Sequence, residues 1–255
     1  MSAIGGHIVH SSLLAIVQWG MTCHRLSSFL VCGLMAVAVV PILCAGQTFA
    51  LDSTEGLQPR NVSIEATTYQ GRKAVRVVPS SESDAAWEAG KSVSGGGIVM
   101  LPKAMFHNGT VELDVSGKPR AGAAPDARGF VGVAFRVAAD GSKYECFYIR
   151  PTNGRAEDQL RRNHSAQYIS YPDFEWSRLR KESPGKYESY VDLVPGDWTK
   201  LKVEVSGNKA RLYVHDAPQP VLVVNDLKLG DGKGMVALWV GVGTEAYFTN
   251  LRLSE

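Results

Sequence analysis

Hydrophobic and polar residues alternate one by one in short runs from about residue 60 to the C-terminus. The clearest runs cover residues 200–205 and 210–215, where Leu, Val and Ala alternate with charged residues, Tyr and His. The turn-forming residues Ser206, Gly207 and Asn208 separate these two runs. Since successive side chains of a strand point to opposite faces, the pattern predicts an antiparallel hairpin with one buried and one solvated face.

Similar runs recur along the chain between Gly, Pro, Asn and Asp residues, and helical periodicity is almost absent. The other predicted strands cover residues 74–78, 110–115, 130–137, 144–150, 221–224, 235–242 and 246–253. With the hairpin they make about nine strands, enough for two packed sheets. Segments 129–135 and 235–240 are apolar on both faces, which predicts central strands, with glycines leaving room against one face. We therefore predict an all-β sandwich.

One segment, residues 151–193, interrupts this rhythm. It has no long alternating run, is rich in charge, and carries the aromatic residues Tyr168, Tyr171, Phe174, Trp176, Tyr187 and Tyr190. A connection of roughly 40 residues is far longer than usual in a compact domain, and such loops are commonly functional. The alternative is a lid or an extra hairpin that only covers an apolar face.

The first 50 residues have the features of a signal peptide. They contain one basic residue, Arg25, and no acid, and an apolar run covers residues 26–43. We predict cleavage after Ala50, with Met21 as an alternative start, and a mature domain over residues 51–255 that is secreted to the extracellular space or the periplasm. An uncleaved N-terminal anchor is the alternative, because the run is near the length that spans a bilayer. After cleavage we expect no membrane association.

Charge and cysteine content argue against a nucleic-acid partner and against an internal disulfide. Of 27 Lys and Arg residues only Arg25 precedes residue 51, so 26 bases face 25 acids in the mature domain, which gives no support for nucleic acid as a partner. Three of the four cysteines lie in the leader, and Cys146 alone remains, so the mature domain has no internal disulfide. Cys146 lies in a predicted strand, and a buried inert thiol is favoured over a nucleophile.

Five short motifs resemble those of one superfamily. They are residues 109–115 (GTVELDV), 132–136 (GVAFR), 143–150 (KYECFYIR), 196–202 (GDWTKLK) and 247–253 (YFTNLRL). Over residues 55–254 the chain resembles the concanavalin A-like lectin/glucanase superfamily, and within it the bacterial extracellular domains of the 3-keto-disaccharide hydrolase type and their laminin-G-like relatives. The resemblance implies a jelly roll of two curved antiparallel sheets whose concave face and rim loops meet carbohydrate.

Glu112 and Asp114 share one face of a predicted strand. They resemble the first two acids of the Glu-x-Asp-x-x-Glu motif of laminarinase-like enzymes, but Ser116 and Gly117 follow Val115 and the third acid is missing. A retaining glycosidase needs two carboxyl groups about 5 to 5.5 Å apart. The sequence therefore favours solvated strand carboxylates over a retaining pair.

The resemblance also implies a polar site. Arg136 and Glu145 stand where 3-keto-disaccharide hydrolase relatives carry an Arg on one central strand and a Glu on the next, so they either bind sugar hydroxyls or form a structural ion pair. Arg150 ends the second strand and either serves the same site or caps it. From the long segment we add Arg161, Arg162, His164, Tyr168 and Trp176, because aromatic faces and directional donors together suit a polar ligand.

Catalysis would require a base. Glu145 and His164 are the candidates, His164 because its ordinary pKa lies near neutrality, although a surface histidine without a catalytic role is the alternative. No histidines or cysteines have metal-ligand spacing, so we expect no metal and no cofactor, with structural calcium held by loop oxygens left open.

Three functions follow from these observations. The first is a secreted domain that binds extracellular glycan without cleaving it, favoured by the missing third acid and the aromatic-rich segment. The second is a glycoside hydrolase of the 3-keto-disaccharide hydrolase type, with Glu145 or His164 as base and Arg136 and Arg150 holding the substrate. The third is a structural or protein-binding laminin-G-like module. Sequence leaves the sugar and the oligomeric state undetermined.

Overall fold

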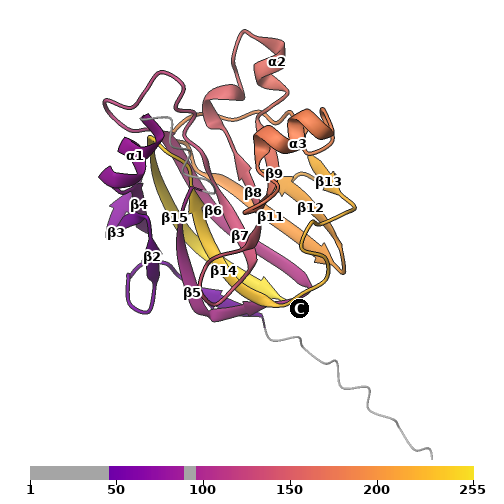
Figure 1. Cartoon of the computed structure of the whole chain (residues 1–255). Coiled ribbons are helices and arrows are strands. Elements are labelled where there is room, and N and C mark those ends of the chain that lie inside the picture. The colour runs from indigo at the N-terminus through magenta and orange to yellow at the C-terminus, as the bar shows by residue number, and fades with distance from the viewer. Residues whose placement is uncertain (1–45, 89–95) are drawn as a thin grey trace, which may run out of the picture. The chain divides into compact units, whose positions relative to one another are not determined.

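A computed structural model describes residues 46–88 and 96–255. The chain divides into two units, Met1–Ile42 and Leu43–Glu255, and the first lies outside the described residues together with nearly all of the predicted signal peptide. Within the described ranges, no helix has both the length and the hydrophobicity needed to cross a bilayer. The second unit consists of two antiparallel sheets that lie one in front of the other (Figure 1).

The first sheet has eight strands in the order β13-β12-β11-β6-β15-β4-β3, with β1 paired to β15. Its strands are β1 (Gln47–Phe49), β3 (Val62–Tyr69), β4 (Arg72–Pro79), β6 (Gly109–Pro119), β11 (Thr199–Ser206), β12 (Lys209–Val214), β13 (Leu222–Val224) and β15 (Thr244–Ser254). The predicted hairpin is β11 and β12, in the register Val203 opposite Leu212. In β6 and β11 buried apolar residues alternate with half-buried or exposed polar ones, so one face of this sheet packs on the core and the other meets water.

The second sheet has seven strands in the order β10-β9-β8-β7-β14-β5-β2. Its strands are β2 (Gln58–Arg60), β5 (Gly97–Phe106), β7 (Val131–Val137), β8 (Tyr144–Ile149), β9 (Ala166–Tyr171), β10 (Glu188–Ser189) and β14 (Gly234–Val240). Every residue of β7, β8 and β14 is buried, which confirms that the doubly apolar segments are central strands. The predicted all-β jelly-roll sandwich is confirmed.

Both faces of the second sheet are filled by side chains. On the face between the sheets, Val133 and Phe147 lie opposite one another among fully buried residues. On the other face Tyr148 stacks on Trp239, with ring centroids 4.5 Å apart. The room that Gly132 leaves is taken by its own neighbouring strand, since a Cβ at Gly132 would lie 2.1 Å from the carbonyl oxygen of Phe147. That glycine therefore permits close strand packing and leaves no space for a ligand.

The segment between β8 and β11 is folded along most of its length. It contains a 3₁₀ turn (Pro151–Asn153), α2 (Gln159–Arg162), the strands β9 and β10, and α3 (Trp176–Glu182). β9 pairs with β8 from Ile149 opposite Ala166 to Tyr144 opposite Tyr171. The expected long loop is thus an extension of the second sheet, with two short helices attached to it.

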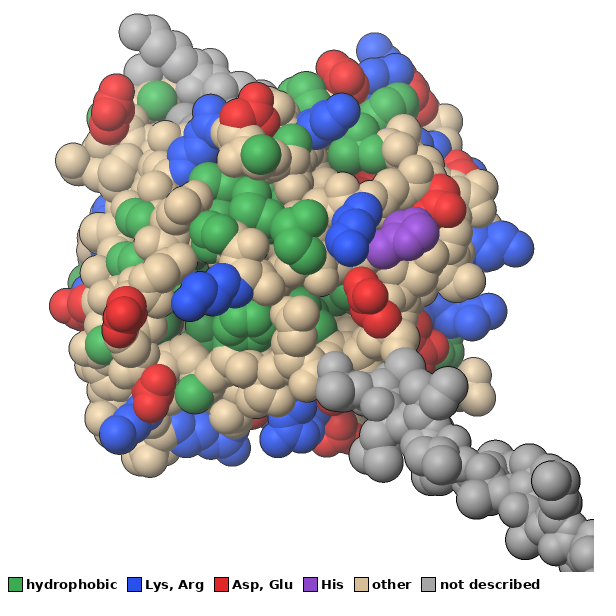
Figure 2. All heavy atoms as spheres, turned by 90° about the horizontal axis from the view of Figure 1, so that it is seen from below, with side chains coloured by type: hydrophobic (Ala, Val, Ile, Leu, Met, Phe, Trp, Pro, Cys, Tyr) green, Lys and Arg blue, Asp and Glu red, His purple; other side chains and the backbone are tan. Residues whose placement is uncertain are grey.

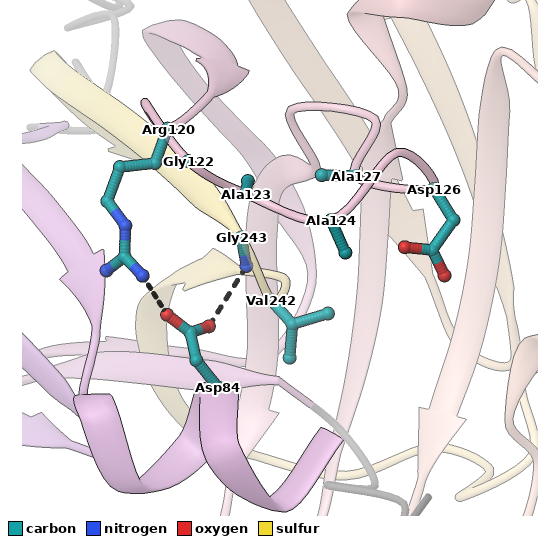
Figure 3. Close-up of a pocket in the computed structure, with 9 residues that line it drawn as sticks. All are labelled: Asp84, Arg120, Gly122, Ala123, Ala124, Asp126, Ala127, Val242 and Gly243. Carbon is teal, nitrogen blue, oxygen red and sulfur yellow. Dashed lines mark hydrogen bonds and ion pairs between the residues drawn. The ribbon is translucent and has the colours of Figure 1, made fainter. Parts of the chain in front are cut away.

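The helix α1 (Ser81–Glu88) is tied to the rims of both sheets by one carboxylate. Asp84 forms an ion pair with Arg120 and accepts a hydrogen bond from the backbone N–H of Gly243 at 3.1 Å (Figure 3). A pocket of about 30 Å³ adjoins this contact. That volume holds roughly one water molecule, so the contact is an anchor and not a ligand site.

Hydrophobic side chains also reach the surface of the domain in places. Seen from below, they gather near the middle of the face, with both basic and acidic side chains around them (Figure 2). In the described part of the chain the exposed large hydrophobic residues are Met105, Leu160, Trp176, Tyr190, Val223 and Leu229. Three of these six lie in the segment that carries α2 and α3, which concentrates exposed apolar surface at one end of the second sheet.

Candidate functional site

A pocket of about 360 Å³ opens where β8 ends and α2 and α3 meet the loop before β7. Figure 1 shows both helices at the end of the domain to which β8 leads. The side chains that line the pocket and carry its chemistry are Arg128, Arg150, Arg161, His164, Trp176 and Arg180. A second pocket of about 600 Å³ shares Leu160, His164 and Arg180 with the first and continues to Tyr190. The two form one open depression, which we call the α2–α3 groove.

Local hydrogen bonds shape the wall of the groove at α2. The carboxylate of Asp158 accepts a hydrogen bond from the backbone N–H of Arg161 at 3.1 Å and caps the helix N-terminus. Nε of Arg161 donates to Oδ1 of Asn153 at 3.0 Å, and Nδ2 of Asn153 donates to the carbonyl of His164 at 3.2 Å. These contacts hold the guanidinium of Arg161 against the 3₁₀ turn.

Arg150 forms the base of the groove. Its guanidinium donates to the hydroxyl of Tyr148 at 2.9 Å, to Oε1 of Gln167 at 3.0 Å and to the carbonyl of His164 at 2.8 Å. These partners occupy most of the N–H donors of Arg150, so its side chain is fixed in position. Arg150 can therefore attract a ligand through its charge more than through hydrogen bonds.

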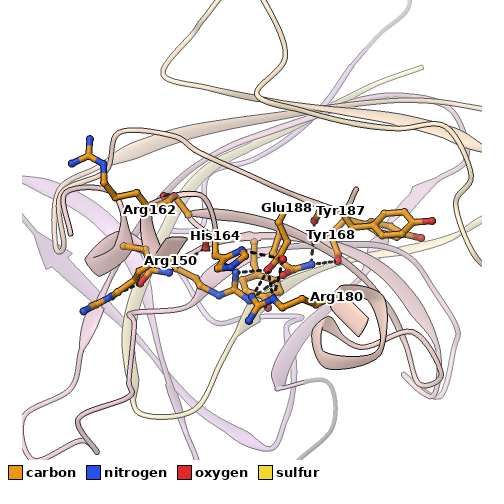
Figure 4. Close-up of polar contacts among 12 residues, drawn as sticks. Arg150, Arg162, His164, Tyr168, Arg180, Tyr187 and Glu188 are labelled. Atoms are coloured by element: carbon orange, nitrogen blue, oxygen red, sulfur yellow. Dashed lines mark hydrogen bonds and ion pairs between the residues drawn. The ribbon is translucent and has the colours of Figure 1, made fainter. Parts of the chain in front are cut away.

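Glu188 lies behind this wall and joins three bases (Figure 4). It pairs with Arg180, accepts from Nε of that residue at 3.0 Å, and lies 3.5 Å from Nη1 of Arg150. Nδ1 of His164 lies 3.0 Å from Oε2 of Glu188, although the angle is not that of a hydrogen bond. The Glu188 side chain is 2% exposed, so this carboxylate is a buried counter-ion for the bases of the groove.

His164 is the one titratable group in the groove whose pKa shift bears on acid–base chemistry. Burial lowers its pKa, the guanidinium groups of Arg180 and Arg150 lower it further, and Glu188 acts in the opposite sense. The imidazole is therefore neutral near pH 7 and can accept a proton.

The structure brings four of the predicted site residues together: Arg150, Arg161, His164 and Trp176 all line the groove. Arg162 lies at its edge, where its guanidinium covers the ring of Tyr190 and donates to the Tyr190 hydroxyl at 3.0 Å. Arg162 is thus a rim residue of the second pocket.

Glu145 and Tyr168 are not part of the groove. Glu145 has no exposed surface and points between the two sheets, where it accepts hydrogen bonds from the Tyr168 hydroxyl at 2.7 Å and from the backbone N–H of Leu229 at 2.8 Å. Tyr168 is equally buried. Burial raises the pKa of Glu145. In this arrangement the pair holds the loop before β14 through the backbone N–H groups of Lys228 and Leu229.

Arg136 lies near the opposite end of the β7–β8 pair from Arg150. Its guanidinium bonds to loop residues, among them Oδ1 of Asn108 at 3.1 Å and Oδ1 of Asp231 at 3.2 Å. It donates to the carbonyls of His107 at 3.0 Å, Gly207 at 2.8 Å and Gly230 at 2.5 Å. Within the described residues Arg136 forms no hydrogen bond or ion pair with Glu145, so the predicted direct pair does not form. Arg136 instead ties three loops together.

The two strand carboxylates lie elsewhere. Glu112 and Asp114 point from β6 to the outer face of the first sheet. Asp114 lies 3.3 Å from Nη1 of Arg72 and accepts from Nδ2 of Asn250 at 2.9 Å. Their surface position agrees with the solvated alternative.

Several residues of the groove were not predicted from sequence. Arg128 and Phe130 come from the loop before β7, Arg180 from α3, and Glu188 from the short strand β10. For Arg180 and Glu188 the available signal is the charge density of residues 151–193, whereas Arg128 and Phe130 lie outside that segment. Among the described residues, no group of three or more His, Cys, Asp or Glu side chains is arranged to hold a metal ion. Cys146 is a free buried thiol, as predicted.

No protein-family model and no curated protein sequence matches the chain at a significant level. Solved structures do match its fold. A carbohydrate-binding module, CBM66 of Bacillus subtilis, superposes with a TM-score of 0.51 at 16% identity, over 78% of this chain and 96% of that one. A Bacillus subtilis protein of unknown function with a galectin-like fold superposes with a TM-score of 0.51 at 11% identity, over 82% and 94% of the two chains. The predicted concanavalin A-like jelly-roll fold is thereby confirmed.

Proposed function

We propose that this protein is a secreted domain that binds extracellular glycan in the α2–α3 groove. The observation that carries the proposal is the convergence, in one open depression, of an exposed tryptophan with fixed cationic donors, namely Trp176, Arg161 and Arg180. That a carbohydrate-binding module is among the solved structures with this fold supports the same class of ligand.

The groove offers both kinds of contact that sugars need. Trp176 is 38% exposed and Leu160 is 66% exposed, which supplies apolar surface for the face of a pyranose ring. The guanidinium of Arg161 supplies directional donors for hydroxyl or acidic groups. Because side-chain contacts already order Arg161, binding loses little conformational entropy there.

Isothermal titration calorimetry against a panel of plant, algal and microbial polysaccharides tests the proposal. We expect binding to at least one polysaccharide, and Trp176→Ala should weaken it at least tenfold, which corresponds to about 1.4 kcal/mol. Val223→Ala, an exposed apolar residue on β13 outside the groove, is the matched control and should bind as the wild type does. Absence of heat with every polysaccharide would contradict the proposal.

A second candidate function, glycoside cleavage, is favoured by one observation. His164 faces both pockets with a lowered pKa, which suits a general base. A reducing-sugar or keto-sugar assay of wild type and His164→Gln tests it. Turnover by the wild type that is lost in His164→Gln would support catalysis. If the wild type binds a polysaccharide and does not cleave it, the protein is a binding domain.

A further inference from the structure

The α2–α3 groove carries more positive charge than its own carboxylates balance. Four arginines, Arg128, Arg150, Arg161 and Arg180, face three carboxylates, Asp126, Asp158 and Glu188, and Glu188 is engaged by Arg150 and Arg180. Among the described residues, no ion pair joins the guanidinium of Arg128 or Arg161 to a carboxylate, and the hydrogen bonds of both side chains go to neutral acceptors. Two guanidinium groups therefore line the same pocket without an ion-pair partner among the described residues.

These charges are close enough to act on one another. Burial lowers the pKa of Arg128, the charge of Arg161 lowers it further, and Arg150 acts in the same direction, while Asp126 opposes them. Like charges that a fold holds together are relieved by an anion placed between them. The pocket is thus electrostatically complementary to a negative group.

The side chains of Arg128 and Arg161 are also held in position while some of their N–H groups remain available. Nη1 of Arg128 donates to the carbonyls of Pro125 at 2.7 Å and Ala127 at 3.1 Å, and no bond is recorded from its Nε or Nη2 within the described residues. Arg161 uses Nε and Nη2 on Asn153 and Thr152, which leaves Nη1 without a recorded bond in the same ranges. A fixed guanidinium with free N–H groups suits the geometry of a carboxylate or sulfate.

Apolar surface lies beside this charge. Phe130, Leu160 and Trp176 line the same pocket as Arg128 and Arg161. A small inorganic anion would leave that apolar surface uncovered. A sugar ring that bears an acidic group would cover both the apolar side chains and the guanidinium groups.

The geometry points to an acidic glycan as the ligand of the groove, with a uronate carboxylate or a sulfate ester bound between Arg128 and Arg161 and a sugar ring on Trp176. This inference rests on the function proposed above and specifies its ligand class.

Paired polysaccharides that differ only in charge test this inference. Polygalacturonate is compared with its methyl ester, and dextran sulfate with dextran, by calorimetry with wild type, Arg128→Gln and Arg161→Gln. We expect at least one acidic polymer to bind tenfold or more tightly than its neutral counterpart. Both variants should lose most of that difference, and the polymer that shows it identifies carboxylate or sulfate as the bound group. Circular dichroism spectra and thermal unfolding confirm that the variants fold.

Arg178→Gln is the matched control, because Arg178 lies on α3, pairs with Glu182 and does not line either pocket. It should retain the full preference. Equal affinity for charged and neutral polymers would overturn the acidic-ligand inference and leave the proposed function standing. An equal loss in Arg178→Gln would also overturn it, because binding would then follow net charge. If none of these four polymers binds, the acidic-ligand inference is overturned, whereas the proposed function is decided by the wider polysaccharide panel.

Discussion

Nδ1 of His164 lies 3.0 Å from Oε2 of Glu188, a carboxylate with almost no exposed surface. The same carboxylate pairs with Arg150 at the base of the groove and with Arg180 on α3. One buried acid from β10 therefore pairs with two guanidinium groups, from the end of β8 and from α3, and lies beside the imidazole that follows α2. The groove depends on this acid for its shape and its charge balance.

Glu188→Gln should destabilise the domain. The variant leaves Arg150 buried without a counter-ion, and removing one partner of a buried pair costs about 3 kcal/mol. Urea unfolding of both forms measures the difference. Glu182→Gln removes an exposed pair on α3 and should cost about 0.5 kcal/mol or less. If the two variants were equally stable, Glu188 would not have the role assigned to it.

His164 should make stability fall on acidification. Its pKa is lowered in the folded state, so the unfolded chain binds more protons as the pH falls through the ordinary value of 6.5 toward the folded value. Unfolding free energy measured between pH 8 and pH 5 should therefore decrease more steeply in the wild type than in His164→Gln. His215→Gln, which changes an exposed histidine, serves as the control. Identical slopes for wild type and His164→Gln would contradict the assignment.

Glu145→Gln should leave glycan binding within twofold of the wild type, because Glu145 contacts Tyr168 and Leu229 in the interior and does not line the groove. Calorimetry with the same polysaccharide compares it with Trp176→Ala, which removes a groove residue. A tenfold loss of affinity in Glu145→Gln, with an unchanged melting temperature, would show that Glu145 takes part in binding.

Strand β1 bears on the predicted cleavage site. Gln47 pairs with Leu253 and Phe49 with Leu251, and the carbonyl of Ala50 accepts a hydrogen bond from the backbone N–H of Asn250 at 3.2 Å. A chain that begins at Leu51 lacks the partly buried Phe49, and we expect it to be less stable than one that begins at Gly46 by about 2 kcal/mol. Urea unfolding of the two chains measures this. Equal stability would favour cleavage after Ala50.

Much of the fold could be predicted because alternation is strong where strands are half buried, as in β11 and β12. The prediction of strands failed where the alternation of apolar and polar residues is broken or weak. β5 contains Pro102, and its pairing with β14 jumps from Leu101 to Met105, so no simple period appears. β3 lies at the edge of its sheet and none of its residues is fully buried, so its apolar face is weak.

The site was harder to predict than the fold, and Arg136 shows why. The strand rule places Arg136 on the opposite face from Phe135, but Arg136 has a φ of 53° and the register of β7 with β14 shifts at this point. An irregularity of this kind redirects a side chain. Arg128, Arg180 and Glu188 come from three separate segments, so only tertiary structure could show that they meet Arg150.

The central claim is that glycan binds in the α2–α3 groove, and nuclear magnetic resonance locates the binding site directly. On titration with a polysaccharide that binds, the side-chain N–H signals of Trp176 and Arg161 should shift most. The signal of Trp198 should stay in place, because Trp198 lies with Tyr69 and Arg72 on the outer face of the other sheet. Shifts centred on Trp198, with Trp176 unchanged, would contradict the account.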